Sequence, residues 1–201
     1  NVGAISTRTF SVDTAAPVSS VTFPSNGTPY TAVGTISGTA VDDVNTTLVE
    51  VQLQRQDDAR YWTGSAWMVA STWAAAASSN PWTFTAVPGP WSSAVTYRVW
   101  ARGRDAAANL ESPGAYVAFS MDTQAATTQI TTPVHGVARS ALATISGAVG
   151  DNYSRVDGVQ VAIASGPGFS TSWNGAAYVG GAEQWNGTTF VGDSSGTWTY
   201  S

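Results

Sequence analysis

Carboxylate and amide side chains recur where the chain is expected to turn, and their oxygens are the ligands that a hard cation such as calcium prefers. The candidates fall in three separate segments rather than in one loop. If the strands between them run alternately up and down, these segments emerge at the same end of a domain. We therefore predict an inter-module calcium site formed by Asp13, Asp42, Asp43, Asp105, Asn109 and Glu111.

A second interpretation of the same residues, which we favour, is a purely structural role in turns. Asp42, Asp105 and Asn109 have the side chains that bond nearby backbone amides in turns, and such residues need no ion. The chain contains no EF-hand loop and no loop rich in Gly and Asp. The fold requires no cofactor on either interpretation, and calcium is the one cofactor that the sequence suggests.

The nine tryptophans suggest a second kind of binding. Flat aromatic rings on a β-sheet can stack against sugars. Trp91, in an expected loop, and Trp100, on the expected outer face of a strand, are the glycan-binding candidates. The alternative is a structural role, which we favour for the tryptophans that recur along the chain: Trp62 with Trp173, Trp82 with Trp198, and Trp73 with Trp185.

Residues for catalysis are scarce. His135 is the only histidine, lies in an expected turn and has no partner pattern for a catalytic triad. A glycosidase needs two carboxylates roughly 5 to 10 Å apart in a cleft, whereas the acids here lie in turns and junctions. We predict that the chain is not an enzyme.

Four Asn-X-Ser/Thr triplets are candidate glycosylation sites, and all fall in expected loops. A chain this rich in Ser, Thr and Asn also produces such triplets by chance. They begin at Asn26, Asn45, Asn152 and Asn186.

Composition limits the class of protein. Only 10% of residues are charged, there is no cysteine, and the formal net charge is -5. Without a basic patch, nucleic acid and anionic lipid are not expected partners. No apolar run approaches the roughly 20 residues of a membrane span, so we expect no membrane insertion of this segment.

The elements that would position these side chains occur more than once. Residues 10–14 (Phe-Ser-Val-Asp-Thr) return 109 residues later as residues 119–123 (Phe-Ser-Met-Asp-Thr), and residues 35–38 (Thr-Ile-Ser-Gly) return as 144–147. This period suits a small domain rather than a solenoid unit. We predict the last strand of a preceding repeat at 1–13, a complete domain at 14–122, and a second domain at 123–201 that is truncated at its C-terminal end.

Periodicity within the complete repeat predicts strands and no helix. Residues 49–54 alternate apolar and polar side chains, with Val49, Val51 and Leu53 facing inward. Residues 61–67 have the pattern of a tight hairpin. Further strands are expected at 18–23, 35–41, 82–87, 95–102 and 115–121. About seven strands in this length indicate an all-β fold of tandem antiparallel β-sandwiches of the immunoglobulin (Ig) kind.

Several of these segments resemble landmarks of tandem bacterial Ig-like repeats in large secreted or cell-surface, adhesin-like proteins. They are residues 13–17 (Asp-Thr-Ala-Ala-Pro), 36–42, 61–67 and 104–111. The chain departs from that pattern at residues 107–108 (Ala-Ala), where Ala-Gly is expected, and at Ala126, where the junction proline is expected.

The resemblance implies an extracellular or cell-surface location and a structural or adhesive role as a stalk or fibre-building unit. The expected partners are neighbouring copies of the same module, including those of a homo-oligomeric filament. The alternative is a module of an adhesin or secreted enzyme that binds surface glycans or another protein. A third hypothesis concerns assembly, in which residues 4–13 of one copy complete the truncated domain of another.

Overall fold

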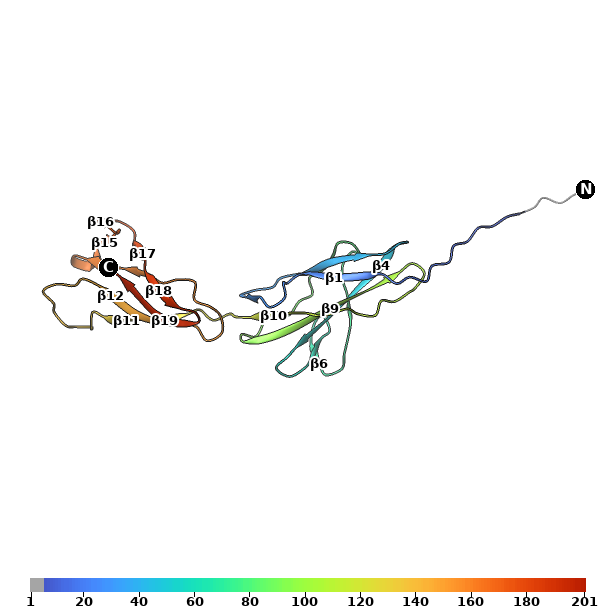
Figure 1. Ribbon diagram of the computed structural model, residues 1–201, viewed down its shortest axis with the longest axis horizontal. Helices are drawn as coiled ribbons and strands as arrows, with labels where there is room; N and C mark the ends of the chain where they lie inside the picture. The colour runs from blue at the N-terminus through green and yellow to red at the C-terminus, as the bar shows by residue number, and fades with distance from the viewer. Residues whose placement is uncertain (1–5) are drawn as a thin grey trace, which may run out of the picture. The chain divides into compact units, whose positions relative to one another are not determined.

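The computed structural model describes residues 6–201, and this part of the chain is all-β, as the sequence predicts (Figure 1). The chain divides into two compact units, here called unit 1, which ends at Thr123, and unit 2, Gln124–Ser201. One turn of 3-10 helix, η1 (Pro167–Phe169), is the only helical element in the described residues. Within residues 6–201, no helix is long and apolar enough to cross a membrane.

Unit 1 consists of two sheets. One has three strands in the order β1-β3-β8, and the other has seven, in the order β2-β10-β9-β4-β5-β6 with β7 also paired to β4. All pairs are antiparallel except that of β10 with β2. The strands are β1 (Val18–Phe23), β2 (Pro29–Tyr30), β3 (Ile36–Val41), β4 (Thr46–Arg55), β5 (Tyr61–Trp62), β6 (Trp67–Met68), β7 (Ala74–Ala75), β8 (Trp82–Phe84), β9 (Val95–Asp105) and β10 (Val117–Met121).

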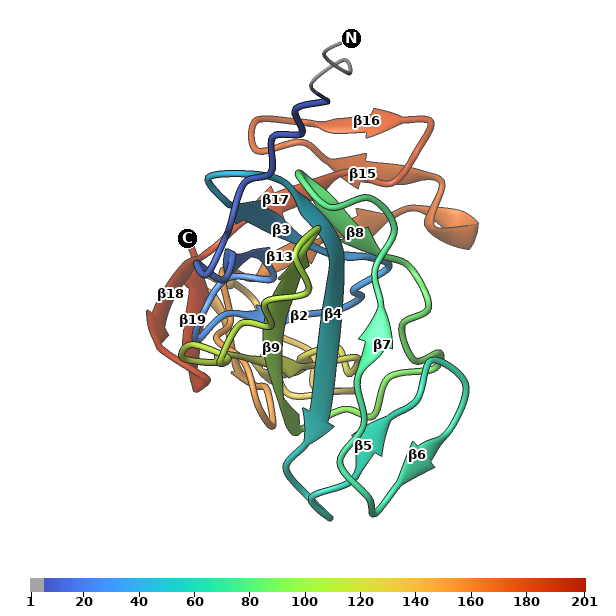
Figure 2. The ribbon, with the colours of Figure 1, turned by 90° about the vertical axis from the view of Figure 1, so that its right-hand side faces the viewer.

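The two sheets of unit 1 enclose one hydrophobic core. Strands β4 and β9 pair over almost their whole length and run side by side in Figure 2. The three side chains predicted to face inward from β4, those of Val49, Val51 and Leu53, are at most 1% exposed. Strand β9 alternates buried and half-buried residues from end to end, because its outer face is also partly covered. Each sheet thus presents one apolar face to the other.

A glycine on β3 and a tryptophan on β8 pack directly against each other. Gly38 lies directly opposite Trp82 in the register of the two strands. A Cβ atom on Gly38 would overlap both the Trp82 indole ring and the carbonyl oxygen of Ser20. Because the glycine has no side chain, the fully buried ring can lie across the strand and donate its Nε1–H to the Thr39 carbonyl at 3.2 Å.

Unit 2 repeats part of this arrangement. Its strands form sheets in the orders β11-β12-β19-β18, β13-β17 and β14-β15-β16. Gly147 of β12 lies opposite Trp198 of β19, as Gly38 lies opposite Trp82. The strands are β11 (Thr127–Thr132), β12 (Ile145–Gly150), β13 (Gln160–Ala162), β14 (Ala164–Ser165), β15 (Thr171–Trp173), β16 (Tyr178–Gly180), β17 (Trp185–Gly187), β18 (Thr189–Gly192) and β19 (Ser195–Tyr200).

The segment before unit 1 was predicted to be the last strand of a preceding repeat, and its first five residues lie outside the described part of the chain. Residues 6–13 are assigned to no strand. Phe10 is 89% exposed and Val12 is 76% exposed, whereas their counterparts Phe119 and Met121 in β10 are buried. The apolar face of this segment is therefore uncovered.

Candidate cation site

Three aspartates from two distant segments meet where the chain enters unit 1. Asp13 precedes β1, and Asp42 and Asp43 follow β3. Each contributes one carboxylate oxygen to a group in which these oxygens all lie within 4.8 Å of one another. Two segments of the predicted calcium site are thus brought together.

Asp13 and Asp42 each use one oxygen in a local turn. Asp13 Oδ1 accepts the backbone N–H of Ala15 at 3.0 Å. Asp42 Oδ2 accepts the backbone N–H groups of Val44 and Asn45 at 3.2 and 3.0 Å. These bonds hold both carboxylates in place, as the turn interpretation predicts.

The second oxygen of each carboxylate is not used in a turn. Asp13 Oδ2 and Asp42 Oδ1 are buried and have no hydrogen-bond partner. Thr46, which lines the same hollow of about 180 Å³ as Asp42, is 6% exposed, and its Oγ1 also lacks a partner. Buried oxygens without donors are costly, and a bound cation is one way to satisfy them.

The electrostatics of the cluster favour a positive ion. Burial raises the pKa of Asp13, and the nearby charges of Asp43, Asp105 and Asp42 raise it further, outweighing the bond from Ala15. A carboxylate with this environment is stabilised by a neighbouring positive charge.

Asp105 and Asn109 lie outside the aspartate group but support the entering chain. Asp105 is 2% exposed and accepts both the backbone N–H and the Nδ2–H of Asn109, at 2.8 and 2.7 Å. Burial alone would raise the pKa of Asp105, but these hydrogen bonds outweigh it and lower the pKa. Asn109 Nδ2 also donates to the Asp13 carbonyl oxygen at 3.2 Å.

Glu111 lies near the same segments but is fully occupied by protein donors. Its Oε1 accepts the backbone N–H of Ser19 at 2.9 Å, and its Oε2 accepts the Ser19 hydroxyl at 2.6 Å and the Gly103 N–H at 2.7 Å. Glu111 is not part of the aspartate group. Its geometry is that of a buried link between β1 and β9.

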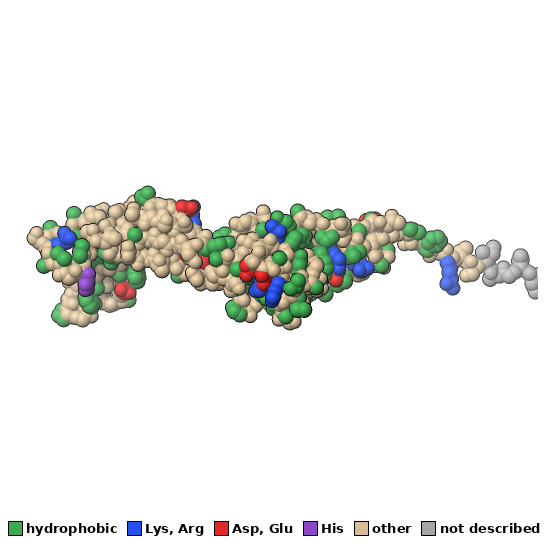
Figure 3. Space-filling view, turned by 90° about the horizontal axis from the view of Figure 1, so that it is seen from below, with side chains coloured by type: hydrophobic (Ala, Val, Ile, Leu, Met, Phe, Trp, Pro, Cys, Tyr) green, Lys and Arg blue, Asp and Glu red, His purple; other side chains and the backbone are tan. Residues whose placement is uncertain are grey.

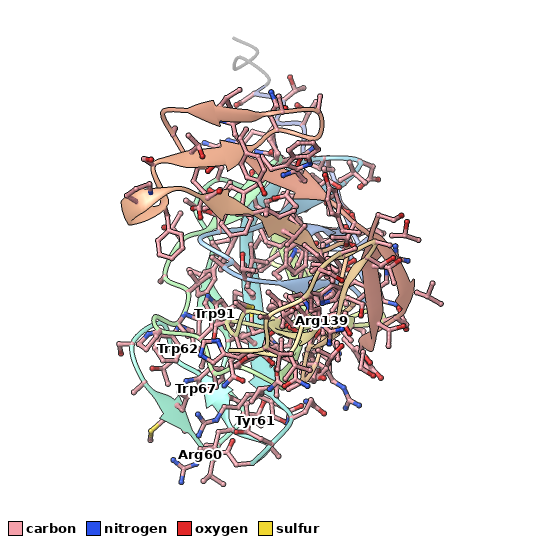
Figure 4. The ribbon with its side chains drawn as sticks, turned by 90° about the vertical axis from the view of Figure 1, so that its left-hand side faces the viewer. Arg60, Tyr61, Trp62, Trp67, Trp91 and Arg139 are labelled. Atoms are coloured by element: carbon pink, nitrogen blue, oxygen red, sulfur yellow. The ribbon has the colours of Figure 1, made fainter. Side chains whose placement is uncertain are left out.

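The two glycan-binding candidates lie in different surroundings. Trp91 packs edge-on against Tyr97 and Phe119, at 4.8 and 5.6 Å between ring centroids, and its Nε1–H donates to the Val33 carbonyl. Trp62 and Trp67 belong to the same aromatic group (Figure 4). These contacts place Trp91 against the core of unit 1.

Trp100 lies on the outer face of β9. Its ring meets Tyr116 in a T-shaped contact at 5.3 Å. Tyr116 is 42% exposed, and the Arg98 guanidinium lies 4.5 Å from its ring centroid. On the side that Figure 3 displays, charged side chains are few compared with polar and apolar ones.

Three of the four predicted glycosylation residues, Asn26, Asn45 and Asn152, are exposed outside strands. The fourth, Asn186, was expected in a loop but lies in β17, and this expectation is wrong. Its Nδ2 donates to the Trp173 carbonyl at 2.8 Å, so the amide that a glycan would modify supports the fold.

A scan against protein-family models matches no family, and searches of curated proteins and of solved structures find no match for the chain.

Proposed function

We propose that the chain is a tandem Ig-like segment of a large extracellular bacterial surface protein or filament, in which it acts as a non-catalytic stalk or fibre-building unit. The internal repeat carries this proposal. The Gly38–Trp82 and Gly147–Trp198 pairs hold equivalent strands in equivalent registers. A chain that repeats one domain gains length with each copy, which suits a spacer.

The order of the strands in unit 1 supports the Ig-like assignment. In Ig-like sandwiches the first, second and fifth strands belong to one sheet, and the third, sixth and seventh to the other. If the short strands β2, β5, β6 and β7 are set aside, the remaining six follow this division, with β1, β3 and β8 in one sheet and β4, β9 and β10 in the other.

The cation site gives the stalk a means of stiffening. Asp13 belongs to the segment that enters unit 1, whereas Asp42 and Asp43 belong to its body. A calcium ion held by all three would tie the entering chain to the sandwich, with water supplying the rest of its six to eight oxygens. The partners implied are neighbouring copies of the same module.

Titration calorimetry and thermal melting test the site. We expect calcium to bind the chain and to raise the melting temperature of unit 1, with chelator reversing the effect. Asp42→Asn keeps an oxygen for the turn but removes the charge, and should weaken calcium binding at least about tenfold. Asp157→Asn, which makes the same charge change on an exposed side chain of unit 2, is the control. If calcium gives no heat of binding and chelator does not change the melting temperature, the proposed cation site is wrong.

Force spectroscopy tests the mechanical role. With the chain held by its two ends, we expect calcium to raise the force needed to unfold unit 1 and to leave that of unit 2 unchanged. Unfolding of unit 1 at low force with and without calcium would contradict the stalk proposal, even if calcium binding itself were measured.

A second candidate function rests on the Trp100–Tyr116 pair. Its partly exposed rings on the outer face of β9 offer an aromatic platform of the kind on which sugars stack. A glycan array followed by tryptophan fluorescence titration tests it, with Trp100→Ala as the binding-deficient variant. If the array gives no signal, the sugar-binding proposal is wrong and only the structural role of the pair remains.

A further inference from the structure

The outer face of β9 concentrates positive charge in an acidic protein. Every second residue of this strand, from Arg98 through Trp100 and Arg102 to Arg104, is partly exposed on that face. The whole chain has eight arginines, no lysine and a formal net charge of -5. Three of its eight basic side chains therefore lie on one face of one strand, beside the Trp100–Tyr116 pair.

Arg102 shows how this face binds a carboxylate. It lies directly opposite Glu50 of β4 in the register of the two strands, and its guanidinium lies 4.3 Å from the centroid of the Trp73 ring. The ring covers one face of the planar group, and the edge, which carries the N–H donors, stays free. Two of its nitrogens, Nε and Nη2, each lie 2.8 Å from Glu50 Oε2.

Arg98 has the same surroundings without the carboxylate. Its guanidinium lies 4.5 Å from the centroid of the Tyr116 ring, but the residue opposite it on β4 is Gln54. The Gln54 amide is turned to the loop that follows β4, where its Nε2–H donates to the Ala59 carbonyl at 3.2 Å. Among residues 6–201, the Arg98 side chain has neither an ion pair nor a hydrogen bond. Its N–H donors are free to bind a ligand.

Trp100 extends this site along the strand. It follows Arg98 by two residues on the same face, about 6.8 Å away along β9, and its ring contacts that of Tyr116. The indole N–H groups of Trp82 and Trp91, which pack in the core, donate to backbone carbonyls. In the described part of the chain, the Trp100 N–H has no such acceptor. An aromatic ring with a free donor at its edge suits the apolar face and the hydroxyl groups of a sugar.

We propose that Arg98, Trp100 and Tyr116 bind a uronic acid residue of an acidic polysaccharide. The sugar ring would stack on Trp100, and its carboxylate would accept hydrogen bonds from the Arg98 guanidinium. This carboxylate takes the place that Glu50 has beside Arg102. A uronic acid carries its carboxylate on the sugar ring, so a single residue can reach both side chains. The inference rests on the second candidate function and gives it a ligand class.

A sugar acid fits these side chains better than a neutral sugar or an acidic peptide. A neutral sugar would leave Arg98 without an anion, and hydrogen bonds between a guanidinium and a carboxylate are roughly twice as strong as neutral ones. An acidic peptide would bring a carboxylate on a flexible side chain, but no rigid ring to lie against Trp100. The uronic acid supplies both.

Matched oligosaccharides test the proposal. Tetramers of galacturonic, glucuronic and mannuronic acid are each compared with the methyl ester, which has the same rings but no charge. We expect at least one acid to bind the full chain about tenfold or more tightly than its ester, because the ester offers no anion to the guanidinium. Tryptophan fluorescence and calorimetry measure the affinities. Chelator is present throughout, so that no calcium ion bridges the sugar and the aspartate group.

Three substitutions separate the charge of the arginine from the stacking of the sugar. Arg98→Gln should weaken binding of the acid about tenfold or more, to the level of the ester. Gln54→Glu places a carboxylate opposite Arg98 and should weaken binding of the acid while leaving that of the ester unchanged. Arg139→Gln, the control, makes the same charge change on an exposed side chain of unit 2 and should change neither affinity. Thermal melting verifies that each variant is folded.

The outcomes distinguish this inference from the function on which it rests. If acid and ester bind equally and Trp100→Ala abolishes both, the aromatic pair binds sugars and the role of the carboxylate is wrong. If no acid binds, or if Arg98→Gln does not weaken the acid that does, the proposal is overturned. If tetraglutamate binds as tightly as the acid and Arg98→Gln abolishes its binding, the partner is an acidic peptide and not a sugar.

Discussion

At the scale of single residues, Asp13 and Asp42 serve two roles at once. One oxygen of each accepts backbone N–H groups in a turn, and the other is buried without a partner. The sequence suggested a turn role and a cation role as alternatives, and the geometry is compatible with both. Turn bonding is predictable because it involves neighbours two or three residues away. The free oxygen is not, because its environment comes from a segment about 30 residues distant.

The pKa of Asp13 leads to a prediction about pH. Its folded-state value is raised by burial and by the neighbouring carboxylates, so the folded state binds this proton more tightly than the unfolded state. The associated stability is present below the unfolded pKa of about 3.9 and is lost as pH rises through the raised value. Without calcium, we expect Asp13→Asn to raise the melting temperature of unit 1 at pH 7 but not at pH 3.

Calorimetry of both proteins in chelator at the two pH values checks this prediction. Calcium at pH 7 should reverse the order, since the ion stabilises the wild-type carboxylate and has less to bind in the variant. Asp157→Asn should leave the melting temperature of unit 1 unchanged at either pH, with or without calcium. If Asp13→Asn instead melts at a lower temperature than the wild type in chelator at pH 7, the charged Asp13 carboxylate does not destabilise the folded state.

Glu111 illustrates what sequence spacing cannot show. It was grouped with the calcium ligands because it follows Asp105 and Asn109, but its carboxylate accepts three hydrogen bonds from Ser19 and Gly103. The donors lie on β9 and on β1, whose residue Ser19 is 92 positions away in the sequence. Only the folded chain brings that donor to Glu111.

Substitution of Glu111 should therefore affect stability and not calcium binding. Glu111→Ala leaves the buried Gly103 N–H without an acceptor, and we expect a loss of about 2 to 3 kcal/mol in the free energy of unfolding of unit 1. Calcium affinity should stay within about twofold of wild type, because the aspartate group does not include this residue. Urea unfolding and calorimetric titration measure the two quantities. A large loss of affinity with unchanged stability would instead restore Glu111 as a ligand.

At the scale of strands and sheets, the regular elements were predictable and the short ones were not. Strands β4 and β9 alternate apolar and polar side chains over many residues, and this period of two is readable without a structure. Strands β2 and β7 have two residues each, too few for any period. They form because longer neighbours offer them an edge.

The repeated glycine is explained by the register of the strands. The recurrence of Ile-Ser-Gly was visible in the sequence, but its reason is the tryptophan that faces Gly38 and, in unit 2, Gly147. A side chain at either position would overlap the indole ring and a strand carbonyl. The glycine and the tryptophan form one packing unit that each domain needs.

Gly38→Ala should therefore destabilise unit 1 strongly. Because backbone as well as ring must move to admit the methyl group, we expect a loss of about 3 kcal/mol, at the upper end of the usual cost of overpacking. Gly34→Ala is the matched control, since a Cβ there meets nothing within 4 Å. Thermal melting of the two variants measures the difference, and equal melting temperatures would contradict this account of the glycine.

At the scale of the whole chain, the two units have separate cores of unequal size. Among the residues that the structure describes, the core of unit 1 contains 14 buried hydrophobic residues and that of unit 2 contains five. The sequence repeat predicted a boundary after residue 122, and the compact units divide after Thr123. How far the core of unit 2 lies open was not predictable from the repeat, because the exposure of a side chain depends on which strands cover it.

Separate cores predict separate unfolding, and equivalent valines provide a matched test. Val51 of β4 and Val161 of β13 occupy the same place in the repeat and are 1% and 5% exposed. Each Val→Ala change should cost about 2 kcal/mol from lost methyl groups and the cavity left behind. We expect two calorimetric transitions, with unit 2 melting first because it buries less apolar surface. Val161→Ala should shift the first transition alone and Val51→Ala the second alone. A single transition that both substitutions lower would mean that the two units unfold as one.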